Sequence, residues 1–473
     1  MNKSHIKITI LGAGISGLSA AYWLQRDGWD ITVLESDHEP GGSMMTRRGD
    51  GFLIDYGPNS GLDTTPLITQ MVTELGLGDE MVYANEIGNK RYILKNGRLH
   101  ALPTTPLAFI QTDLFSLKAK LRLLAEPFIG PSPDGYYQSI SQFVERRLGR
   151  EFLDYAVNPF VAGVFAGNPD ELSVKSAFPK LYRLEEVYGG LIKGFIKGAK
   201  ERKARSETSK QSARIFSFRS GMQVFPKAIA ARPGIRLQYD CHVEKVMRHQ
   251  GRLTVISSRN GKTAEDETDI ILSAIPAHSA ATVFAEMDPQ LSVHLKDIYY
   301  PPVKVLYLGY RKAAIRQPLD GFGFLIPEKE KKTFLGAIWS STLFPDRSRD
   351  DLAAFTLFVG GARSPELFEN EPELLNKAVM AEFHDIMGIK EDPVFIKEKM
   401  WSRAIPQYKI GYVEHERYFR TFEGDNPGIF LSGNYRGGIS VGDCIKNSEI
   451  TYLKVKEYIL NLASFRHIEK GIG

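Results

Sequence analysis

The first forty residues of the chain place the tightest limits on its fold. An apolar stretch at Ile6–Leu11 runs directly into the glycine-rich turn Gly12–Gly17, a helical pattern covers residues 18–27, and a second apolar stretch at 30–34 ends at Glu35. Such glycines permit a tight turn and close approach of the backbone to a pyrophosphate, whose charge the N–H groups of the following helix can bind. A carboxylate about twenty residues after the glycines is placed to accept hydrogen bonds from a ribose. The stretch therefore predicts a Rossmann-like dinucleotide site at Gly12, Ala13, Gly14, Ile15, Ser16, Gly17 and Glu35.

A second glycine pair narrows the type of dinucleotide. Gly41-Gly42-Ser43 follows shortly after Glu35, and Asp55-Tyr56-Gly57-Pro58 comes next. The second pair would let backbone reach the same pyrophosphate from the other side, which a nicotinamide dehydrogenase does not need. The doubled arrangement resembles the FAD-dependent amine oxidase and desaturase superfamily. A glycine-rich turn can also join a strand to a helix for steric reasons alone, and this ligand-free alternative stays open.

Length and composition exclude several classes of protein. A chain of 473 residues is too long for a single compact core, and a net charge of +4 makes nucleic acid an improbable partner. Cys241 and Cys444 form neither a disulfide framework nor a zinc spacing, so we expect a reducing compartment and no metal site. No apolar run reaches the length of a membrane-spanning helix, and the first strand begins too early for a cleavable leader to precede it. We expect a cytoplasmic protein that is soluble or peripheral on the inner face of the cell membrane.

The remaining patterns predict three regions. Residues 91–99 read as a hairpin around Asn96-Gly97, residues 101–205 as a helical insert, and residues 300–400 as a sheet-rich block that ends in a helix at 372–387. The expected fold class is α/β plus α+β, with a discontinuous Rossmann-like FAD domain, a mixed-sheet substrate domain and an inserted helical subdomain. The predicted boundaries are 1–85, 215–290 and 400–473 for the FAD domain, 86–100 and 291–399 for the substrate domain, and 101–214 for the insert.

The insert carries two features with open interpretations. Its large apolar residues have two possible roles. They form an ordinary helix core, or they dock on a membrane surface with nearby cations close to anionic headgroups. The basic segment 193–214 fits a solvated or disordered linker, or a site for phosphate or lipid headgroups. The docking interpretation uses Phe109, Ile110, Leu114, Phe115, Leu117 and Phe128, with Lys118, Lys120 and Arg122.

Several stretches outside the cofactor motif carry a more specific resemblance and together span nearly the whole chain. They are Gly163-Val164-Phe165-Ala166-Gly167-Asn168 and residues 99–103, 171–173, 321–327, 358–361 and 433–442. These stretches resemble the protoporphyrinogen oxidase family, flavoenzymes of late haem and chlorophyll biosynthesis, and within it the oxygen-dependent type. The stretch 163–168 is the most family-specific.

This resemblance implies a set of contacts to a non-covalent FAD. The glycine turn and Glu35 belong to it, and the turn 439–441 would lie beneath the isoalloxazine, before a helix whose N–H groups can stabilise negative charge on the reduced ring. The further implied contacts are Ser36, Gly41, Gly42, Ser43, Gly57, Pro58, Asn59, Ser60, Val243, Trp401, Ile439, Ser440 and Val441.

The resemblance also implies substrate contacts. Arg91 matches an arginine that pairs with a propionate of the porphyrinogen, a role that suits a planar fork of donors. Leu325, Ile338 and Phe358 match apolar residues on either side of the macrocycle. The alternatives are a surface arginine and ordinary sheet core. Asn59 and Asp63 replace residues that are often basic in animal members, which puts propionate contacts there in doubt.

No catalytic triad or Cys/His pair is recognised, so we expect no catalytic side chain and flavin N5 as the hydride acceptor. The implied reaction is six-electron oxidation of protoporphyrinogen IX to protoporphyrin IX, with oxygen as acceptor and hydrogen peroxide as by-product. Three alternatives stay open: coproporphyrinogen III oxidation to coproporphyrin III, another amine oxidase or desaturase, and a non-catalytic lipid carrier of the same fold. The sequence leaves a homodimer open.

Overall fold

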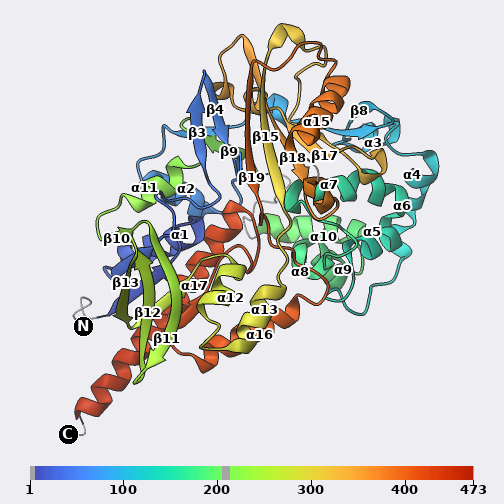
Figure 1. Ribbon diagram of the computed structural model, residues 1–473. Helices are drawn as coiled ribbons and strands as arrows, with labels where there is room; N and C mark the ends of the chain where they lie inside the picture. The colour runs from blue at the N-terminus through green and yellow to red at the C-terminus, as the bar shows by residue number, and fades with distance from the viewer. Residues whose placement is uncertain (1–5, 205–212, 370, 472–473) are drawn as a thin grey trace.

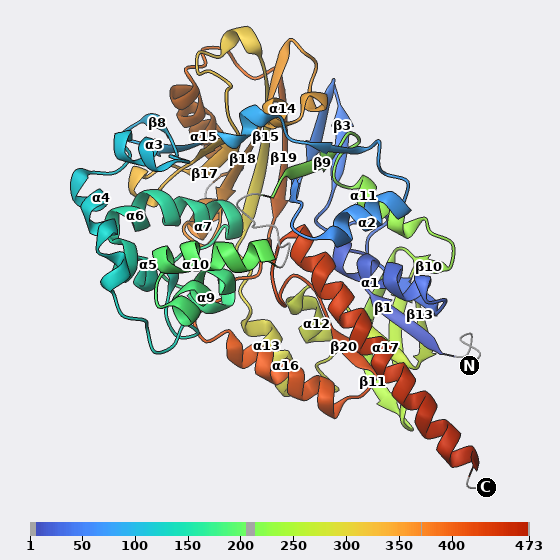
Figure 2. The same ribbon diagram turned by 180° about the vertical axis from the view of Figure 1, so that it is seen from behind.

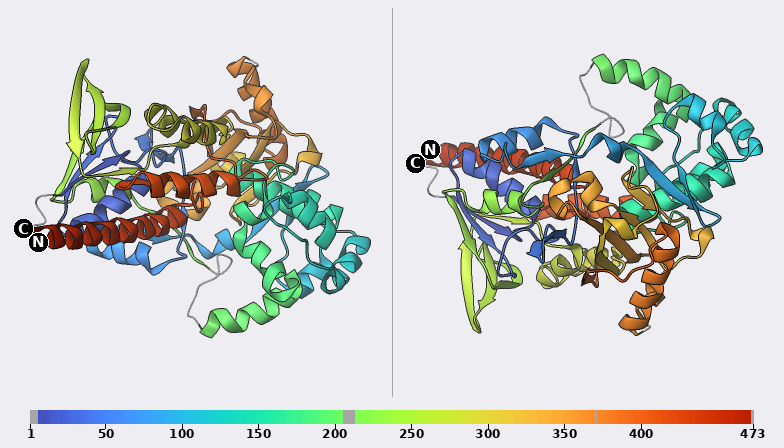
Figure 3. Two further views of the ribbon diagram at one scale, coloured as in Figure 1. Left: turned by 90° about the horizontal axis from the view of Figure 1, so that it is seen from below. Right: turned by 90° about the horizontal axis from the view of Figure 1, so that it is seen from above.

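The computed structural model describes residues 6–204, 213–369 and 371–471. A parallel sheet with its helices, a taller mixed sheet and a helical insert form three regions (Figure 1). Both termini lie at the end of the molecule opposite the insert (Figure 3). The last helix, α17 (Val441–Gly471), begins near the centre of the molecule and runs outward to the C-terminus (Figure 2).

The parallel sheet is assembled from distant parts of the chain. Its five strands lie in the order β10-β2-β1-β14-β20, and every neighbouring pair is parallel. The apolar β1 is buried on both faces, as a central parallel strand should be. Helices α1 and α17 pack against each other beside the sheet. The bounds are β1 (Lys7–Leu11), α1 (Ile15–Arg26), β2 (Asp30–Leu34), β10 (Ile235–Gln238), β14 (Ile270–Ser273) and β20 (Ile429–Leu431).

Smaller elements extend this region. A three-stranded antiparallel sheet joins β11, β12 and β13, and two shorter sheets pair β3 with β4 and β9 with β5 and β6. The strands are β3 (Thr46–Gly49), β4 (Phe52–Asp55), β5 (Gly61–Leu62), β6 (Met81–Tyr83), β9 (Ile215–Phe218), β11 (Cys241–His249), β12 (Arg252–Arg259) and β13 (Lys262–Thr268). The helices are α2 (Pro66–Glu74), α11 (Val224–Ala230), α12 (Ala277–Val283), α13 (Pro289–Asp297) and α16 (Val413–Asp425).

The taller sheet has seven strands in the order β19-β15-β18-β17-β16-β7-β8. All its neighbours are antiparallel except β16 and β7, which run parallel. Side chains from one of its faces pack with α15 in an apolar core that includes Phe324, Phe355 and Phe383. The bounds are β7 (Arg91–Lys95), β8 (Arg98–Ala101), β15 (Val303–Arg311), β16 (Gly323–Leu325), β17 (Phe334–Ile338), α14 (Ser340–Leu343), β18 (Leu352–Gly360), α15 (Pro372–Met387) and β19 (Phe395–Trp401).

The insert consists of helices around their own core, which includes Phe143, Val161 and Phe165. A π-helical turn, η4 (Leu153–Val157), interrupts the helical run between α6 and α7. The other elements are α3 (Pro106–Gln111), α4 (Leu117–Leu124), η3 (Glu126–Phe128), α5 (Ile140–Leu148), α6 (Arg150–Phe152), α7 (Asn158–Phe165), α8 (Val174–Ala177), α9 (Pro179–Tyr188) and α10 (Leu191–Ala204).

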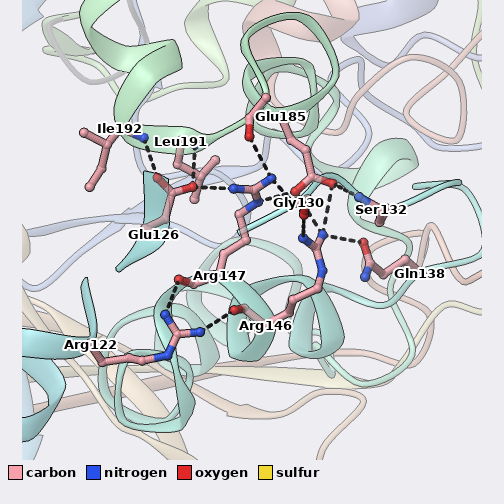
Figure 4. Close-up of polar contacts among 11 residues, drawn as sticks. Arg122, Glu126, Gly130, Ser132, Gln138, Arg146, Arg147, Glu185, Leu191 and Ile192 are labelled. Atoms are coloured by element: carbon pink, nitrogen blue, oxygen red, sulfur yellow. Dashed lines mark hydrogen bonds and ion pairs between the residues drawn. The ribbon is translucent and has the colours of Figure 1, made fainter. Parts of the chain in front are cut away.

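A buried ionic network joins the helices of the insert (Figure 4). The Arg147 side chain has no exposed area and donates to Glu126 Oε1 at 2.7 Å and to Glu185 Oε2. Glu126 also accepts the backbone N–H groups of Leu191 and Ile192 at 2.7 and 3.1 Å, which satisfies two free donors at the start of α10. The network therefore ties η3, α5, α9 and α10 into one unit.

The structure corrects part of the docking interpretation. Leu114 and Phe115 are buried, because they pack with Ile93 of β7 and Tyr155 of η4. Lys120 donates to the carbonyls of Ile110 and Thr112, and Arg122 donates to those of Arg146 and Arg147. These four side chains are therefore held within the insert.

The linker interpretation of residues 193–214 is wrong for its first half. Residues up to Ala204 belong to α10, which packs against α9. A Cβ at Gly194 would lie 2.7 Å from that of Leu184, so glycine permits the close helix contact. Residues 205–212 lie outside the described residues.

Candidate flavin and substrate site

The glycine turn has the geometry that the dinucleotide prediction requires. Gly12 has a φ of +95°, and a Cβ at Gly17 would lie 2.0 Å from the Gly12 carbonyl oxygen, so both positions need glycine. A Cβ at Gly14 would meet no atom within 4 Å. Gly14 is the N-cap residue of α1, and no side chain caps the first turn of that helix. Open space therefore adjoins helix N–H groups that can bind an anion.

The second glycine pair lies against the first. Gly41 and Gly14 form an isolated parallel bridge, and the Gly41 N–H donates to the Ala13 carbonyl at 2.9 Å. Gly41 and Gly42 have φ values of +129° and +57°. Two backbone segments free of side chains thus face the space beside Gly14, a cradle that fits a pyrophosphate.

Glu35 is held at the end of β2 by the same turn. Its carboxylate is buried and accepts the Ala13 N–H at 2.6 Å on Oε2, and the Asp37 N–H at 3.0 Å and the Ser36 hydroxyl at 3.2 Å on Oε1. Val243 is half-buried on β11, whose first residue donates its N–H to the Glu35 carbonyl at 2.9 Å. The predicted ribose and adenine contacts therefore lie at one end of the cradle.

The loop that contains Gly57 continues the cradle toward the taller sheet. A Cβ at Gly57 would lie 1.8 Å from the Ser43 carbonyl oxygen, so the two loops touch. The Trp401 indole donates to the Tyr56 carbonyl at 2.9 Å, and Pro58 and Ser60 are half-buried beside it. The Asn59 amide donates to the carbonyl of Asp55 at 2.8 Å, while its buried Oδ1 has no partner within the described residues. An unpaired buried acceptor is costly, so this position suits a ligand that donates a hydrogen bond.

The turn at Ile439-Ser440-Val441 leads into α17 at the centre of the molecule. The Ser440 hydroxyl donates to Asp443 Oδ2 at 2.6 Å and accepts the Asp443 N–H at 3.2 Å, which fixes the first turn of α17. The Gly438 N–H donates to the Tyr408 hydroxyl at 2.9 Å. Ser448 in the same helix donates to the Ser16 carbonyl at 2.8 Å, which links this turn to the glycine turn. This contact holds the start of α17 close to the glycine turn, and the cofactor contacts stay predictions.

The four predicted substrate residues share one face of the taller sheet. On β16, Gly323 lies opposite Arg91 of β7 on one side and Ile338 of β17 on the other. Leu325, two residues further along β16, lies opposite Gly336 of β17. Gly336 in turn lies opposite Phe358 of β18. Directly opposed residues point to the same face and side chains alternate along a strand. Leu325, Ile338 and Phe358 are half-buried there, and the opposite face carries the α15 core. Their binding roles stay predictions.

Arg91 stands at the edge of this face without a counterion. Arg91 as a whole residue is exposed to solvent, but protein atoms surround its guanidinium group. This partial desolvation of the guanidinium lowers the pKa of Arg91. No carboxylate in the described part of the chain forms an ion pair with it, whereas the neighbouring Lys90 pairs with Asp320. An uncompensated guanidinium is a ready receptor for a carboxylate.

Helix α7 covers part of the apolar face with the stretch that suggested the family. A Cβ at Gly163 would lie 2.6 Å from Leu325 Cδ2, so the helix approaches the sheet closely. Ala166 ends the helix in the left-handed region at φ 49°, and its carbonyl accepts the Ala362 N–H at 2.7 Å. A strained non-glycine residue is thus held in place beside the predicted substrate face.

Comparison with known proteins identifies the family. A family model described as flavin containing amine oxidoreductase matches residues 15–449. The chain belongs to the flavin-containing amine oxidoreductases. Within them, protoporphyrinogen oxidase 2 of Arabidopsis thaliana is 32% identical and covers 93% of this chain and 91% of its own length. Coproporphyrinogen III oxidase of Bacillus subtilis is 25% identical over 97% and 99% of the two chains. The resemblance to the protoporphyrinogen oxidase family is confirmed.

Solved structures share the fold of this chain. A crystal structure from Exiguobacterium sp. 255-15, described as a candidate protoporphyrinogen oxidase, matches with a TM-score of 0.78 at 22% identity over 96% of this chain and 99% of the other. A putrescine oxidase bound to putrescine matches with a TM-score of 0.67 at 16% identity over 96% and 99%. The predicted fold class is confirmed, and the domain boundaries stay a prediction.

The structure adds a supporting residue that the sequence did not indicate. Gln223, 3% exposed, donates from Nε2 to the Pro40 carbonyl and accepts the Thr46 N–H on Oε1, each at 3.0 Å. It therefore braces both ends of the segment that contains the second glycine pair. Gln223 follows a short loop with no recognisable motif, and only its burial reveals it.

Proposed function

We propose that the protein binds FAD and oxidises a porphyrinogen to the porphyrin, with protoporphyrinogen IX as the main substrate and oxygen as the acceptor. The observation that carries this proposal is the uncompensated Arg91 at the edge of an apolar sheet face. A porphyrinogen presents propionates along one edge of a broad apolar macrocycle, so that face matches its distribution of charge. The names of the full-length relatives support the same substrate class.

In this proposal the side chains of the protein bind the substrate and orient it. When bound, FAD supplies the redox chemistry. Arg91 would hold a propionate through two parallel hydrogen bonds, while Leu325, Ile338 and Phe358 exclude water from the macrocycle. The substrate loses six electrons and six protons, which three molecules of oxygen take up as three molecules of hydrogen peroxide. The pyrrole protons can leave to water, so the proposal needs no side chain as a base.

Coproporphyrinogen III is the second candidate substrate, favoured by the names of the bacterial relatives. Aerobic turnover of the purified protein, followed by porphyrin fluorescence, would separate the two. Faster oxidation of protoporphyrinogen IX supports the main proposal, and faster oxidation of coproporphyrinogen III supports the second. A yellow protein inert on both would contradict the porphyrinogen proposal.

The variant Arg91→Met should lose about 10- to 150-fold in kcat/KM for the porphyrinogen, because hydrogen bonds to a charged group contribute about 1.5–3 kcal/mol. Its visible flavin spectrum should be unchanged, since Arg91, the first residue of β7, is not among the residues assigned to the cofactor. Arg91→Lys should recover only part of the loss, because an ammonium lacks the planar fork. The matched control is Arg98→Met, which removes the same charge from an exposed position of the same hairpin. Equal kinetics for Arg91→Met and the control would refute the anchoring role.

We propose further that the insert docks on an anionic membrane surface. Leu117, Leu121 and Leu124 expose 72%, 58% and 68% of their area along α4, with Phe128 at 89% just beyond them. These positions recur once per helical turn, and Leu107 and Ile110 of α3 expose 64% and 68%. Lys118 remains available for headgroups on the same helix. No helix in the described ranges is long and apolar enough to cross a membrane.

Phe128→Glu combined with Leu121→Glu should reduce co-sedimentation with vesicles of equal parts phosphatidylglycerol and phosphatidylcholine by at least about tenfold. Each substitution replaces an inserted apolar side chain by a charge that the lipid interface repels. Leu374→Glu is the matched control, because Leu374 is a leucine 58% exposed on α15, outside the insert. Wild-type protein that fails to bind these vesicles, or a double variant that binds as well as wild type, would refute docking.

A further inference from the structure

The segment Gly321-Phe322-Gly323 holds one aromatic ring in a tightly defined place. A Cβ at Gly321 would lie 2.5 Å from the Lys90 carbonyl oxygen, and one at Gly323, with φ +135°, would lie 2.0 Å from that of Ala337. The flanking glycines therefore let the backbone of Phe322 fit between β7 and β17. Its N–H donates to the Lys90 carbonyl at 2.7 Å, and its carbonyl accepts the Trp339 N–H at 2.9 Å.

The ring of Phe322 is also fixed by packing, and it faces the guanidinium of Arg91. It lies against the apolar cluster formed by Ile215, Leu343 and Phe344. The Arg91 Cζ atom lies 5.4 Å from its centroid, within the range of a cation–π contact. A rigid aromatic face thus adjoins a long and otherwise adaptable side chain.

Two adjacent cations, Lys90 just before β7 and Arg91 at its start, have opposite surroundings. Lys90 pairs with Asp320, which neutralises its charge, while the guanidinium of Arg91 lies over the uncharged ring of Phe322. A carboxylate beside Arg91 would orient the guanidinium equally well, but it would compete with a carboxylate of the substrate. An aromatic face orients the group through its quadrupole and leaves the N–H donors free.

We propose that Phe322 is a positioning residue that aligns Arg91 for the propionate of the substrate without neutralising its charge. This inference rests on the proposed function, because it takes Arg91 as the substrate anchor. Phe322 acts through Arg91 and carries no chemistry of its own. Its contribution should appear in substrate binding and not in the rate of turnover of bound substrate.

The test is a double-mutant cycle measured on the flavin-loaded protein with protoporphyrinogen IX. Phe322→Leu should raise KM about two- to fivefold with kcat nearly unchanged, since cation–π contacts at accessible sites are modest. Phe322→Tyr should retain the wild-type KM, because it keeps the aromatic face. In the Arg91→Met background Phe322→Leu should cause no further rise, because its partner is gone.

The outcomes separate this inference from the proposed function. If Arg91→Met leaves KM unchanged, the anchoring role fails and the inference fails with it. If Arg91→Met raises KM but Phe322→Leu raises it by the same factor in both backgrounds, the anchor stands and the positioning role is refuted. Phe322→Met, of similar volume and without a ring face, carries the same test if Phe322→Leu loses its flavin. Loss of flavin in both would refute the proposal, because the ring would then serve packing.

Discussion

Replacing Gly14 with valine should abolish flavin retention while leaving the protein folded. Gly14 has extended backbone angles, φ −70° and ψ 173°, that valine adopts without strain. A Cβ there meets no protein atom within 4 Å, so the fold itself offers no clash. The added side chain would instead occupy the open space beside Gly14, where we propose that the pyrophosphate lies. Turnover should fall by at least about a hundredfold, as expected when a bound cofactor loses about 3 kcal/mol or more.

The comparison must separate loss of cofactor from loss of fold. Gly14→Val should match flavin-stripped wild-type protein in circular dichroism and melting temperature, since a bound ligand itself adds stability. Gly78→Val is the matched control, because a Cβ there also meets no atom within 4 Å and Gly78 lies in an exposed turn. Gly17→Val should behave differently and unfold, because its Cβ would lie 2.0 Å from a backbone oxygen. A yellow, active Gly14→Val protein would contradict the proposed cradle.

The parts of the fold that the sequence predicted are those fixed by local chemistry. The glycine turn, the hairpin at Asn96-Gly97 and the helix α15 lie where expected, because turn geometry and helical periodicity act over a few residues. The predicted substrate residues also lie together, although that prediction came from resemblance. Sheet register brings Arg91 beside residues more than two hundred positions away, and no local pattern encodes such a pairing.

The predictions that failed depended on tertiary contacts. Composition suggested a linker at 193–214, but Glu126, far away in sequence, caps the start of α10. Gly194 also lets α10 pack closely against α9. Leu114, Phe115 and Leu117 are equally apolar in the sequence. The fold buries Leu114 and Phe115 and leaves Leu117 exposed. Strand β13 was missed, because six of its seven residues are exposed and it lacks an apolar face. In each case the deciding partner comes from another element.

The buried network of the insert should make Arg147→Met strongly destabilising. Removing this guanidinium leaves Glu126 with two backbone donors and no cation in a position with no exposed area. Glu185 keeps Arg146 and the backbone N–H of Ser132. Breaking a buried ion pair on one side costs about 3–5 kcal/mol. Amide hydrogen exchange on α9 and α10 should therefore speed up by about two to four orders of magnitude, if these helices open as a unit.

Two further variants test whether the uncompensated charge of Glu126 causes the destabilisation in Arg147→Met. Adding Glu126→Gln to Arg147→Met should restore part of the protection, because the amide still accepts the N–H groups of Leu191 and Ile192 and carries no charge. Arg150→Met removes an arginine whose side chain is 68% exposed and pairs with Asp154, so it should change stability by less than about 1 kcal/mol. If Arg147→Met and Arg150→Met exchange at the same rate, the network contributes nothing beyond a surface ion pair. If only the first loses protection and Glu126→Gln recovers it, the insert is held together by charge balance at its centre.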